Sequence, residues 1–250
     1  MIMGIAMSMG TAVIMNADYA PEGLEKLFRI IQFTDSAFPV GTFTFSNGLE
    51  TAAHLGIVHD AASLRQYAAS AASQAAFTDG VIALLAYRAA VAGDYGRVIA
   101  ADQKLMLFKM NAEARLMLCR MGKKLAELGV RLYGKDSLFG RWLADCEAGV
   151  TPGTYPVAQA LAFAQEELGE QALYVAHQYG VINMILSAAL RLVRVSHYDT
   201  QAILFELGKT AERDYERARD MDFENMHSFV PEMDIFASLH EKGKMRMFMN

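Results

Sequence analysis

The chain has 250 residues and a formal net charge of −5 at pH 7, with 53% hydrophobic and 20% charged residues. This balance excludes an intrinsically disordered chain and indicates a globular protein with a substantial core. The acidic charge, without a polybasic run, argues against a nucleic-acid-binding or anionic-membrane-binding protein. Cys119 and Cys146 have no metal-ligand spacing and are too few for a disulfide scaffold, so we expect buried thiols in a reducing cytoplasm.

The first residues form an apolar segment without a charge. Residues 1–15 are too short for a comfortable membrane span, and no basic residue precedes them as a signal peptide requires. We expect residues 1–20 to form a poorly ordered extension, with Met15 as an alternative start. A cryptic membrane anchor is the less favoured alternative.

Helical periodicity dominates the rest of the chain. Apolar residues recur at a spacing of three to four, and residues suited to helix caps stand between the periodic runs. Ser46 and Asp60 are expected to cap two of the helices, and Gly56 is expected to close one. In chain order, helices are predicted on the stripe Leu24, Leu27, Phe28 and Ile31, over 46–54, from Asp60 onward, and over 98–128, 137–147, 157–168, 170–194 and 197–219.

The fold class follows from this pattern. No alternating β pattern longer than four residues appears, whereas residues 225–250 show little periodicity of either kind. We predict an all-α fold, a single-domain bundle of about ten helices over residues 21–224, followed by a less regular tail over 225–250.

Motifs of catalytic chemistry are weak. Residues 129–136 (GVRLYGKD) nearly spell a phosphate-binding loop, but Asp136 takes the place of the hydroxyl residue and no strand precedes it. Ser46 lacks the strand and the first glycine of a nucleophile elbow. The six histidines show no close ligand spacing, and His177 lies on an apolar stripe, as a core histidine does. We therefore predict neither an enzyme nor a metal site.

The connection at 33–50 (FTDSAFPVGTFTFSNGLE) is the most unusual segment. Pro39 ends the preceding helix, and the glycines allow backbone shapes that other residues resist. Phe38, Phe43 and Phe45 carry too much apolar surface for an ordinary solvated loop. They are expected to tuck under the body of the protein or to meet another protein.

Four blocks resemble one known family. Residues 30–50 (IIQFTDSAFPVGTFTFSNGLE) are similar to the N-terminal signature of the urease accessory protein UreF family, whose usual form is close to LLQLSDSALPVGAFSHSQGLE. The blocks at 153–169 (GTYPVAQALAFAQEELG) and 187–204 (SAALRLVRVSHYDTQAIL) follow in the family's order. Residues 230–241 (VPEMDIFASLHE) resemble its PLxDIxSMxHE ending. The resemblance covers residues 24–250.

The resemblance implies a cytoplasmic, all-helical, dimeric and non-catalytic protein. Such proteins join UreD (also called UreH) and the GTPase UreG in a complex that activates apo-urease by delivering nickel. No tightly bound cofactor is implied, because nickel is handled by the complex. A scaffolding role and a GTPase-activating role both stay open.

Partner-binding residues are expected in the matching blocks and on one basic helix face. In that face Arg115 is followed by Arg120, Lys123 and Lys124, which indicates either a solvated surface or a contact with an acidic partner. The predicted set is Asp35, Ser36, Pro39, Gly41, Phe43, Ser46, Gly48, Glu50, Arg115, Arg191, Gln201, Asp234, Ile235, His240 and Glu241. The last four are expected to lie in a tail that orders when UreD binds.

Two expectations compete with the family pattern. Residues 194–197 are RVSH where the family usually has PLGQ, so the helix could continue through this point. The alternative function is a small-molecule-binding protein or enzyme with a pocket between helices, around His177 and Tyr179.

Overall fold

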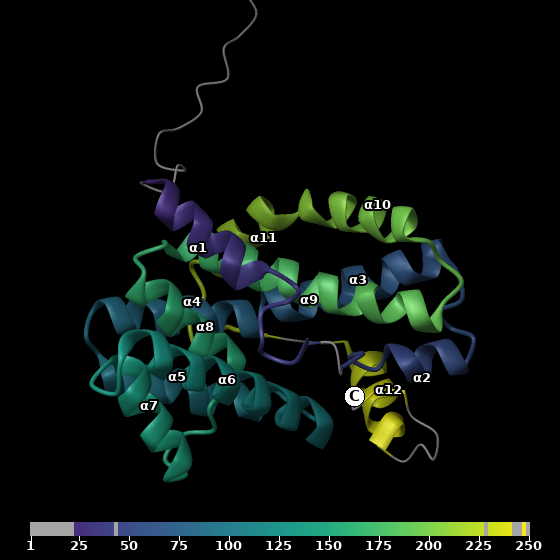
Figure 1. Ribbon diagram of the computed structural model, residues 1–250. Helices are drawn as coiled ribbons and strands as arrows, with labels where there is room; N and C mark the ends of the chain where they lie inside the picture. The colour runs from purple at the N-terminus through teal and green to yellow at the C-terminus, as the bar shows by residue number, and fades with distance from the viewer. Residues whose placement is uncertain (1–22, 43–44, 228–229, 242–246, 249–250) are drawn as a thin grey trace, which may run out of the picture.

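The computed structural model of the chain describes residues 23–42, 45–227, 230–241 and 247–248. Within these residues it shows twelve α-helices and no β-strand (Figure 1). The predicted all-α bundle with a less regular tail is confirmed. The extension expected over 1–20 lies outside the described residues.

The helices are short to medium in length and follow one another closely. In chain order they are α1 (Leu24–Thr34), α2 (Leu49–His54), α3 (Ala61–Ala76), α4 (Asp79–Val91), α5 (Tyr95–Leu107), α6 (Ala112–Tyr133), α7 (Leu138–Glu147), α8 (Tyr155–Gln165), α9 (Glu170–Leu192), α10 (His197–Gly208), α11 (Ala211–Ala218) and α12 (Pro231–Glu241).

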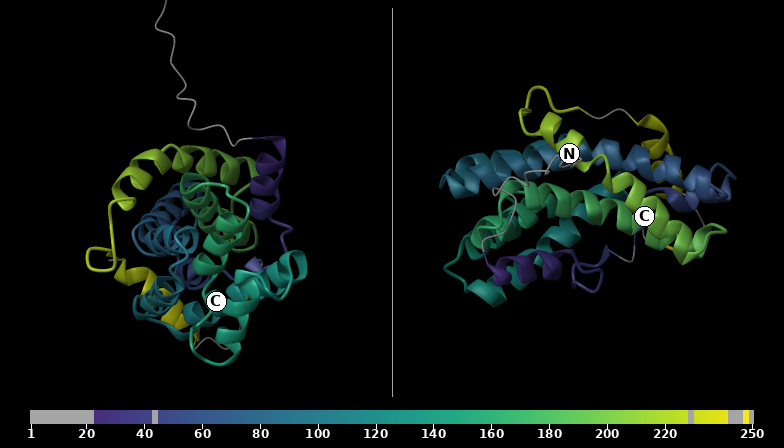
Figure 2. Two further views of the ribbon diagram at one scale, coloured as in Figure 1. Left: turned by 90° about the vertical axis from the view of Figure 1, so that its left-hand side faces the viewer. Right: turned by 90° about the horizontal axis from the view of Figure 1, so that it is seen from above.

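Helix α9 joins the two apolar clusters of the core. The first cluster contains Trp142, Phe163 and Tyr174 and is built mainly by α4 to α8 and the first half of α9. The second contains Leu64 and Ile185 and is built by α2, α3, the second half of α9, α10 and α12. Figure 2 shows α3 and α9 side by side along the length of the protein. Each fully buried large side chain stabilises the fold by about 1.5–3 kcal/mol.

Two helical stretches are apolar and long enough to cross a membrane, Ala61–Val91 and Glu170–Leu192. However, 72% and 61% of their most apolar windows are buried inside the protein. Their apolar character is therefore explained by their place in the core.

Two predicted caps are confirmed. The Asp60 side chain accepts a hydrogen bond from the Ser63 backbone N–H at 2.8 Å, and the Ser63 hydroxyl pairs with the Asp60 backbone in return, which makes a capping box. Gly56 closes the turn after α2 with a φ of 71°.

The cap predicted at Ser46 is wrong. Helix α2 begins two residues later than expected, with Gly48 in the left-handed conformation at its N-cap. The buried Ser46 hydroxyl instead accepts a hydrogen bond from the Glu50 backbone N–H at 3.5 Å.

The helix predicted over 98–128 is two helices. The chain breaks after α5, and Asn111 caps α6 by accepting a hydrogen bond from the Ala114 backbone N–H at 2.7 Å. Gly129 lies inside α6 against the Phe139 ring, where a Cβ would come within 2.5 Å of the ring carbon Cγ. Residues 129–133 are therefore helix, and the phosphate-loop reading is excluded for them.

The chain breaks on both sides of α10. The break between the helices predicted over 170–194 and 197–219 is confirmed, whereas the second break, inside 197–219, was not predicted. Helix α9 ends at Leu192, and Ser196 and Asp199 form a capping box that starts α10. The helix expected over 197–219 is divided into α10 and α11. The absence of a proline and a glycine at 194–197 thus does not remove the turn, because a serine cap provides it.

The C-terminal tail contains one helix that the sequence pattern did not predict. Little periodicity was expected over 225–250, but Pro231 starts the helix α12. Proline suits a first helical position because its missing N–H would have no partner there. The division of the chain at residue 224 stays a prediction.

Candidate partner-binding site

The signature segment and the C-terminal helix lie together in space although they are far apart in sequence. Helix α12 packs against α2, which begins at the end of the signature, and against the start of α6 (Figure 1). The predicted residues of both blocks therefore belong to one region of the protein.

A buried network joins three helices at this point. His240 of α12 lies between Glu50 of α2 and Glu113 of α6, with its Nε2 3.0 Å from Glu50 Oε2 and its Nδ1 2.8 Å from Glu113 Oε2. All three residues are buried, and His240 is only 4% exposed. His240 was expected in a tail that orders when UreD binds, but it lies on a helix that packs against the body of the protein.

Glu50 also holds the chain beyond α12. Its Oε1 accepts a hydrogen bond from the Met247 backbone N–H at 2.7 Å, and its Oε2 accepts one from the Phe248 backbone N–H at 3.0 Å. Burial alone would raise the pKa of Glu50, but these bonds and His240 outweigh burial, and the pKa is lowered. The Arg191 guanidinium lies over the Phe248 ring at 4.2 Å from its centre.

Glu241 caps the first turn of α6. Its Oε1 accepts hydrogen bonds from the backbone N–H groups of Ala112, at 2.7 Å, and Glu113, at 3.2 Å. The first N–H groups of a helix have no partner within the helix, and the positive end of its dipole favours a carboxylate. The His240–Glu241 pair therefore binds α6 with both side chains.

Gly48 lets α12 approach closely. It has a φ of 79°, and a Cβ on it would lie 3.0 Å from the Tyr67 hydroxyl oxygen and 3.1 Å from the Ala237 nitrogen. The Tyr67 hydroxyl donates a hydrogen bond to the Asn47 carbonyl at 2.7 Å, which fixes the turn before α2. Glycine is the residue that fits both requirements at this position.

The rest of the signature forms a corner at the surface. Asp35, Ser36, Pro39 and Gly41 are exposed. Phe45 is buried and Phe38 is half-buried against Phe33, with 5.6 Å between the ring centres, whereas Phe43 lies outside the described residues. Of the three phenylalanines, Phe38 and Phe45 thus tuck under the body, as expected.

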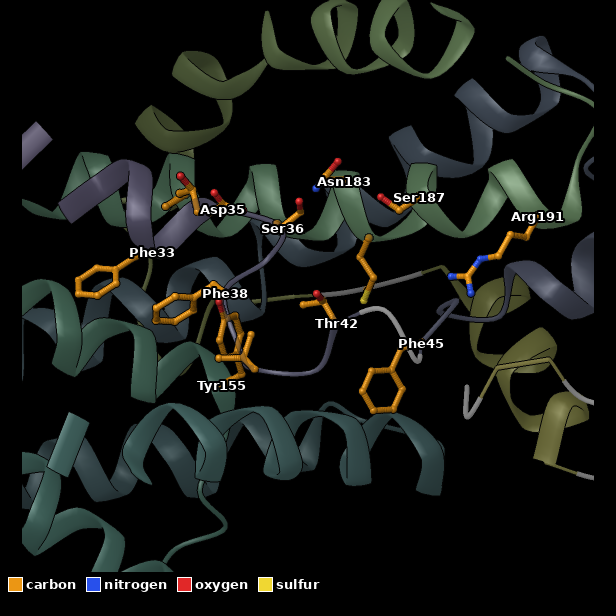
Figure 3. Close-up of a pocket in the computed structure, with 15 residues that line it drawn as sticks. Phe33, Asp35, Ser36, Phe38, Thr42, Phe45, Tyr155, Asn183, Ser187 and Arg191 are labelled. Carbon is orange, nitrogen blue, oxygen red and sulfur yellow. The ribbon is translucent and has the colours of Figure 1, made fainter. Parts of the chain in front are cut away.

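A groove runs between this corner and α9. Asp35 and Ser36 lie beside α9, which contributes Asn183, Ser187 and Arg191 to the groove (Figure 3). These polar groups and the aromatic residues below them offer a partner both hydrogen bonds and apolar contact.

Helix α1 presents an apolar ridge to solvent. The predicted stripe of Leu24, Leu27, Phe28 and Ile31 forms a helix, as expected, but all four side chains are exposed, by 45–87%. The other side of α1 is held by ion pairs to Glu166 and Glu167 and by the buried Phe33. A shallow hollow lined in part by Phe28, Ile31, Asp35 and Pro39 connects the ridge to the corner.

The remaining predicted residues lie in three places. Asp234 and Ile235 are on α12, where Asp234 is half-buried and Ile235 is 54% exposed. Arg115 is exposed on α6, with its Nε donating to the Lys109 carbonyl at 2.7 Å. Gln201 is exposed on α10 and is not among the residues that line the groove.

Glu113 is the residue that sequence reasoning missed. It lay inside the helix predicted over 98–128, where a glutamate has no special role. The pattern Asn111-Ala-Glu113 is typical of a helix start, with a capping residue and an acid in the first turn. That signal would have placed Glu113 at a helix N-terminus.

A separate cavity lies beside His177. It has a volume of about 90 Å³ and is lined by residues that include Asp79, Lys109, Gly180 and Met184. His177 Nδ1 is 3.0 Å from Gln159 Oε1, and its buried Nε2 has no partner among the described residues. Burial lowers the pKa of His177 to about 4, so its ring is neutral.

Asp79 and Lys109 in the cavity wall form an ion pair. In the described part of the chain, no group of three or more histidine, cysteine, aspartate and glutamate side chains is arranged to hold a metal ion.

Comparison with known proteins defines the family. Residues 58–208 match the family model UreF. Proteins described as urease accessory protein UreF from Yersinia pestis (strain Pestoides F) and Yersinia pseudotuberculosis serotype I (strain IP32953) are each 47% identical over 224 residues, which cover 90% of this chain and 98% of theirs. The protein of that description from Yersinia enterocolitica serotype O:8 is 46% identical over the same shares. The chain therefore belongs to the UreF family of urease accessory proteins, which are not enzymes.

Proposed function

We propose that this protein bridges UreD/UreH and the GTPase UreG in the cytoplasmic complex that inserts nickel into apo-urease. The proposal is supported mainly by one observation. Some of the predicted residues hold α12 in place, whereas others are exposed on the elements held in this way. Glu50, His240 and Glu241 anchor α12 and its surroundings, while exposed apolar side chains point outward from the anchored elements.

The outer face of α12 is the proposed contact for UreD/UreH. Ile235 and Leu239 are one turn apart and are 54% and 46% exposed, although both are large apolar side chains. Apolar anchors on a helix whose other face is fixed bind a groove with little ordering cost. This keeps the tail as the UreD contact but presents it as a docked helix.

The exposed corner and its groove are the proposed contact for UreG. Asp35, Ser36 and Pro39 are exposed beside the groove along α9. The apolar ridge of α1 supports a homodimer, because a second copy would remove four exposed apolar side chains from water. Nickel is cargo in this proposal, and no resident cofactor is assigned to the chain.

The test is activation of nickel-free urease in an extract that lacks only this protein. Adding the purified protein should restore activity, and UreD and UreG should co-purify with it. Failure to restore activity when both partners and nickel are present would contradict the proposal.

Point variants separate the contacts. The pair Ile235→Asp and Leu239→Asp should abolish co-purification of UreD and leave UreG unaffected. Glu232→Gln, on the exposed side of the same helix, is the matched control and should bind both partners. If the aspartate pair retains UreD at the level of the control, the α12 contact is wrong.

The cavity beside His177 is the observation that favours a small-molecule function. Tyr179 does not line it, so the pocket predicted around both residues involves only His177. A molecule that co-purifies with the native protein and is lost from Gly180→Leu, which would fill the cavity, would support this second candidate. Full urease activation by Gly180→Leu would show that the accessory function does not need the cavity.

A further inference from the structure

The Glu50–His240–Glu113 network requires one proton more than a neutral histidine and two carboxylates contain. Because Glu50 accepts two backbone N–H groups and has a lowered pKa, its carboxylate is ionised, and His240 Nε2 must donate to it. His240 Nδ1 then faces Glu113 Oε2 at 2.8 Å. Without a proton between these two atoms, two lone pairs would meet at that distance in a buried site, which is repulsive. Imidazole is a stronger base than a carboxylate, so the ring carries this proton.

The charges around the network favour this proton. Three acidic residues surround the ring. Glu50 lies on α2 and Glu113 lies on α6, while Glu241 lies on α12 and caps the N-terminus of α6. Asp234 also lies on α12, and the positive charge of Lys109 acts on its carboxyl. The Arg191 guanidinium lies over the Phe248 ring, and the imidazolium is the positive charge between the two carboxylates.

We propose that Glu50, Glu113 and the first turn of α6 form a peptide-docking site that selects a cationic residue followed by an acidic one. Its resident ligand is this chain's own helix α12 together with residues 247–248. The imidazolium of His240 binds both carboxylates, Glu241 binds the N–H groups of α6, and the backbone at 247–248 binds Glu50.

The proton makes docking depend on pH. The docked segment holds a proton that a free histidine loses above about pH 6.5. Because the docked state binds more protons than the released state, raising the pH favours release.

Release would also change what the protein offers to others. The two carboxylates and the N-terminus of α6 would become open to a cation–acid pair from another chain. In the complex proposed above, α12 would be presented to UreD/UreH at neutral pH and withdrawn at alkaline pH. That consequence rests on the proposed function, whereas docking within the chain does not.

NMR of the full-length protein between pH 5.5 and 9 tests the site without any partner. At pH 6, both ring nitrogens of His240 should carry protons, and the Phe248 amide should have the shift of an ordered residue. As the pH rises, the Phe248 signal should move to a random-coil position as the ring loses a proton. A neutral His240 ring in the docked state, or an ordered Phe248 amide unchanged to pH 9, would overturn the proposal.

Two variants separate the proton from the other contacts. Glu113→Gln supplies an amide N–H that can donate to a neutral imidazole, so docking should persist at pH 9. Glu241→Gln removes the charged cap but not the proton, so docking should weaken by a similar factor at every pH. Release of Glu113→Gln with the pH dependence of the wild type would also overturn the proposal. If a variant fails to fold, the ring signals of the wild type still show whether His240 carries both ring protons in the docked state.

Discussion

Replacement of Gly48 by alanine tests how the signature holds the C-terminal helix. Two costs are expected. Alanine in the left-handed conformation costs about 1–2 kcal/mol. Its Cβ would also lie 3.0 Å from Tyr67 Oη, 3.1 Å from the Ala237 nitrogen and 3.3 Å from the Met233 oxygen. Two of these three atoms belong to the backbone of α12, so they move only with the helix, and overpacking of this kind costs about 1–3 kcal/mol.

Gly56 provides the matched control for the first cost. It has a φ of 71°, and nothing lies within 4 Å of a Cβ built on it. Gly56→Ala should therefore lose only the conformational cost, while Gly48→Ala should lose about 2–5 kcal/mol in total. Urea denaturation followed by circular dichroism measures both variants under the same conditions.

Hydrogen exchange is a second measurement, and it reports whether α12 stays docked. Gly48→Ala should increase hydrogen exchange at the backbone of residues 233–240, and Gly56→Ala should leave it unchanged. Equal losses of stability in the two variants, with α12 equally protected from exchange in both, would contradict the role of Gly48 in holding α12.

Three further predictions follow from buried groups. The Asp102 carboxylate accepts hydrogen bonds from the backbone N–H groups of Gly153 and Thr154, and each buried N–H left without a partner costs about 1–3 kcal/mol. Asp102→Ala should therefore lower the free energy of unfolding by about 2–6 kcal/mol. A loss below about 1 kcal/mol in urea denaturation would contradict this. Gly180→Ala should raise stability by up to about 1 kcal/mol, since the position is inside α9 and open to the cavity, and a lowered midpoint would show that the space is filled. Because the pKa of Glu50 is lowered in the folded protein, its carboxylate stabilises the fold above its unfolded pKa, and this stabilisation is lost as the pH falls through its folded pKa. In acid titrations the wild type should therefore lose more stability than Glu50→Gln. Equal losses would contradict the lowered pKa of Glu50.

Local features were predictable where one side chain decides them. The Asp60 cap, the Gly56 turn and the helix at 138–147 follow from short-range chemistry and are confirmed. The break before α6 was equally local, because Asn111 is a good cap, but the apolar periodicity on both sides masked it. Apolar periodicity alone cannot show where one helix ends and the next begins when the spacing of the apolar residues is the same on both sides of the break.

Long-range features were not predictable from the sequence. The stripe on α1 predicts a helix, yet an apolar stripe looks the same whether it faces the core or the solvent. In the same way, nothing near Glu50 indicates that its partner is His240, 190 positions later in the chain. The family resemblance marked both residues as important, but it could not show that they contact each other.

This pairing changes how substitutions in the matching blocks should be interpreted. A substitution at Glu50, Gly48 or His240 would alter the docking of α12 before it altered any surface that a partner could contact. Loss of partner binding in such a variant would therefore not identify a partner contact. Substitutions at Ile235 or Ser36 leave the buried network intact, because both side chains are exposed. Only this second kind of variant can locate a partner protein on the surface, and the first kind reports on the internal structure that positions α12.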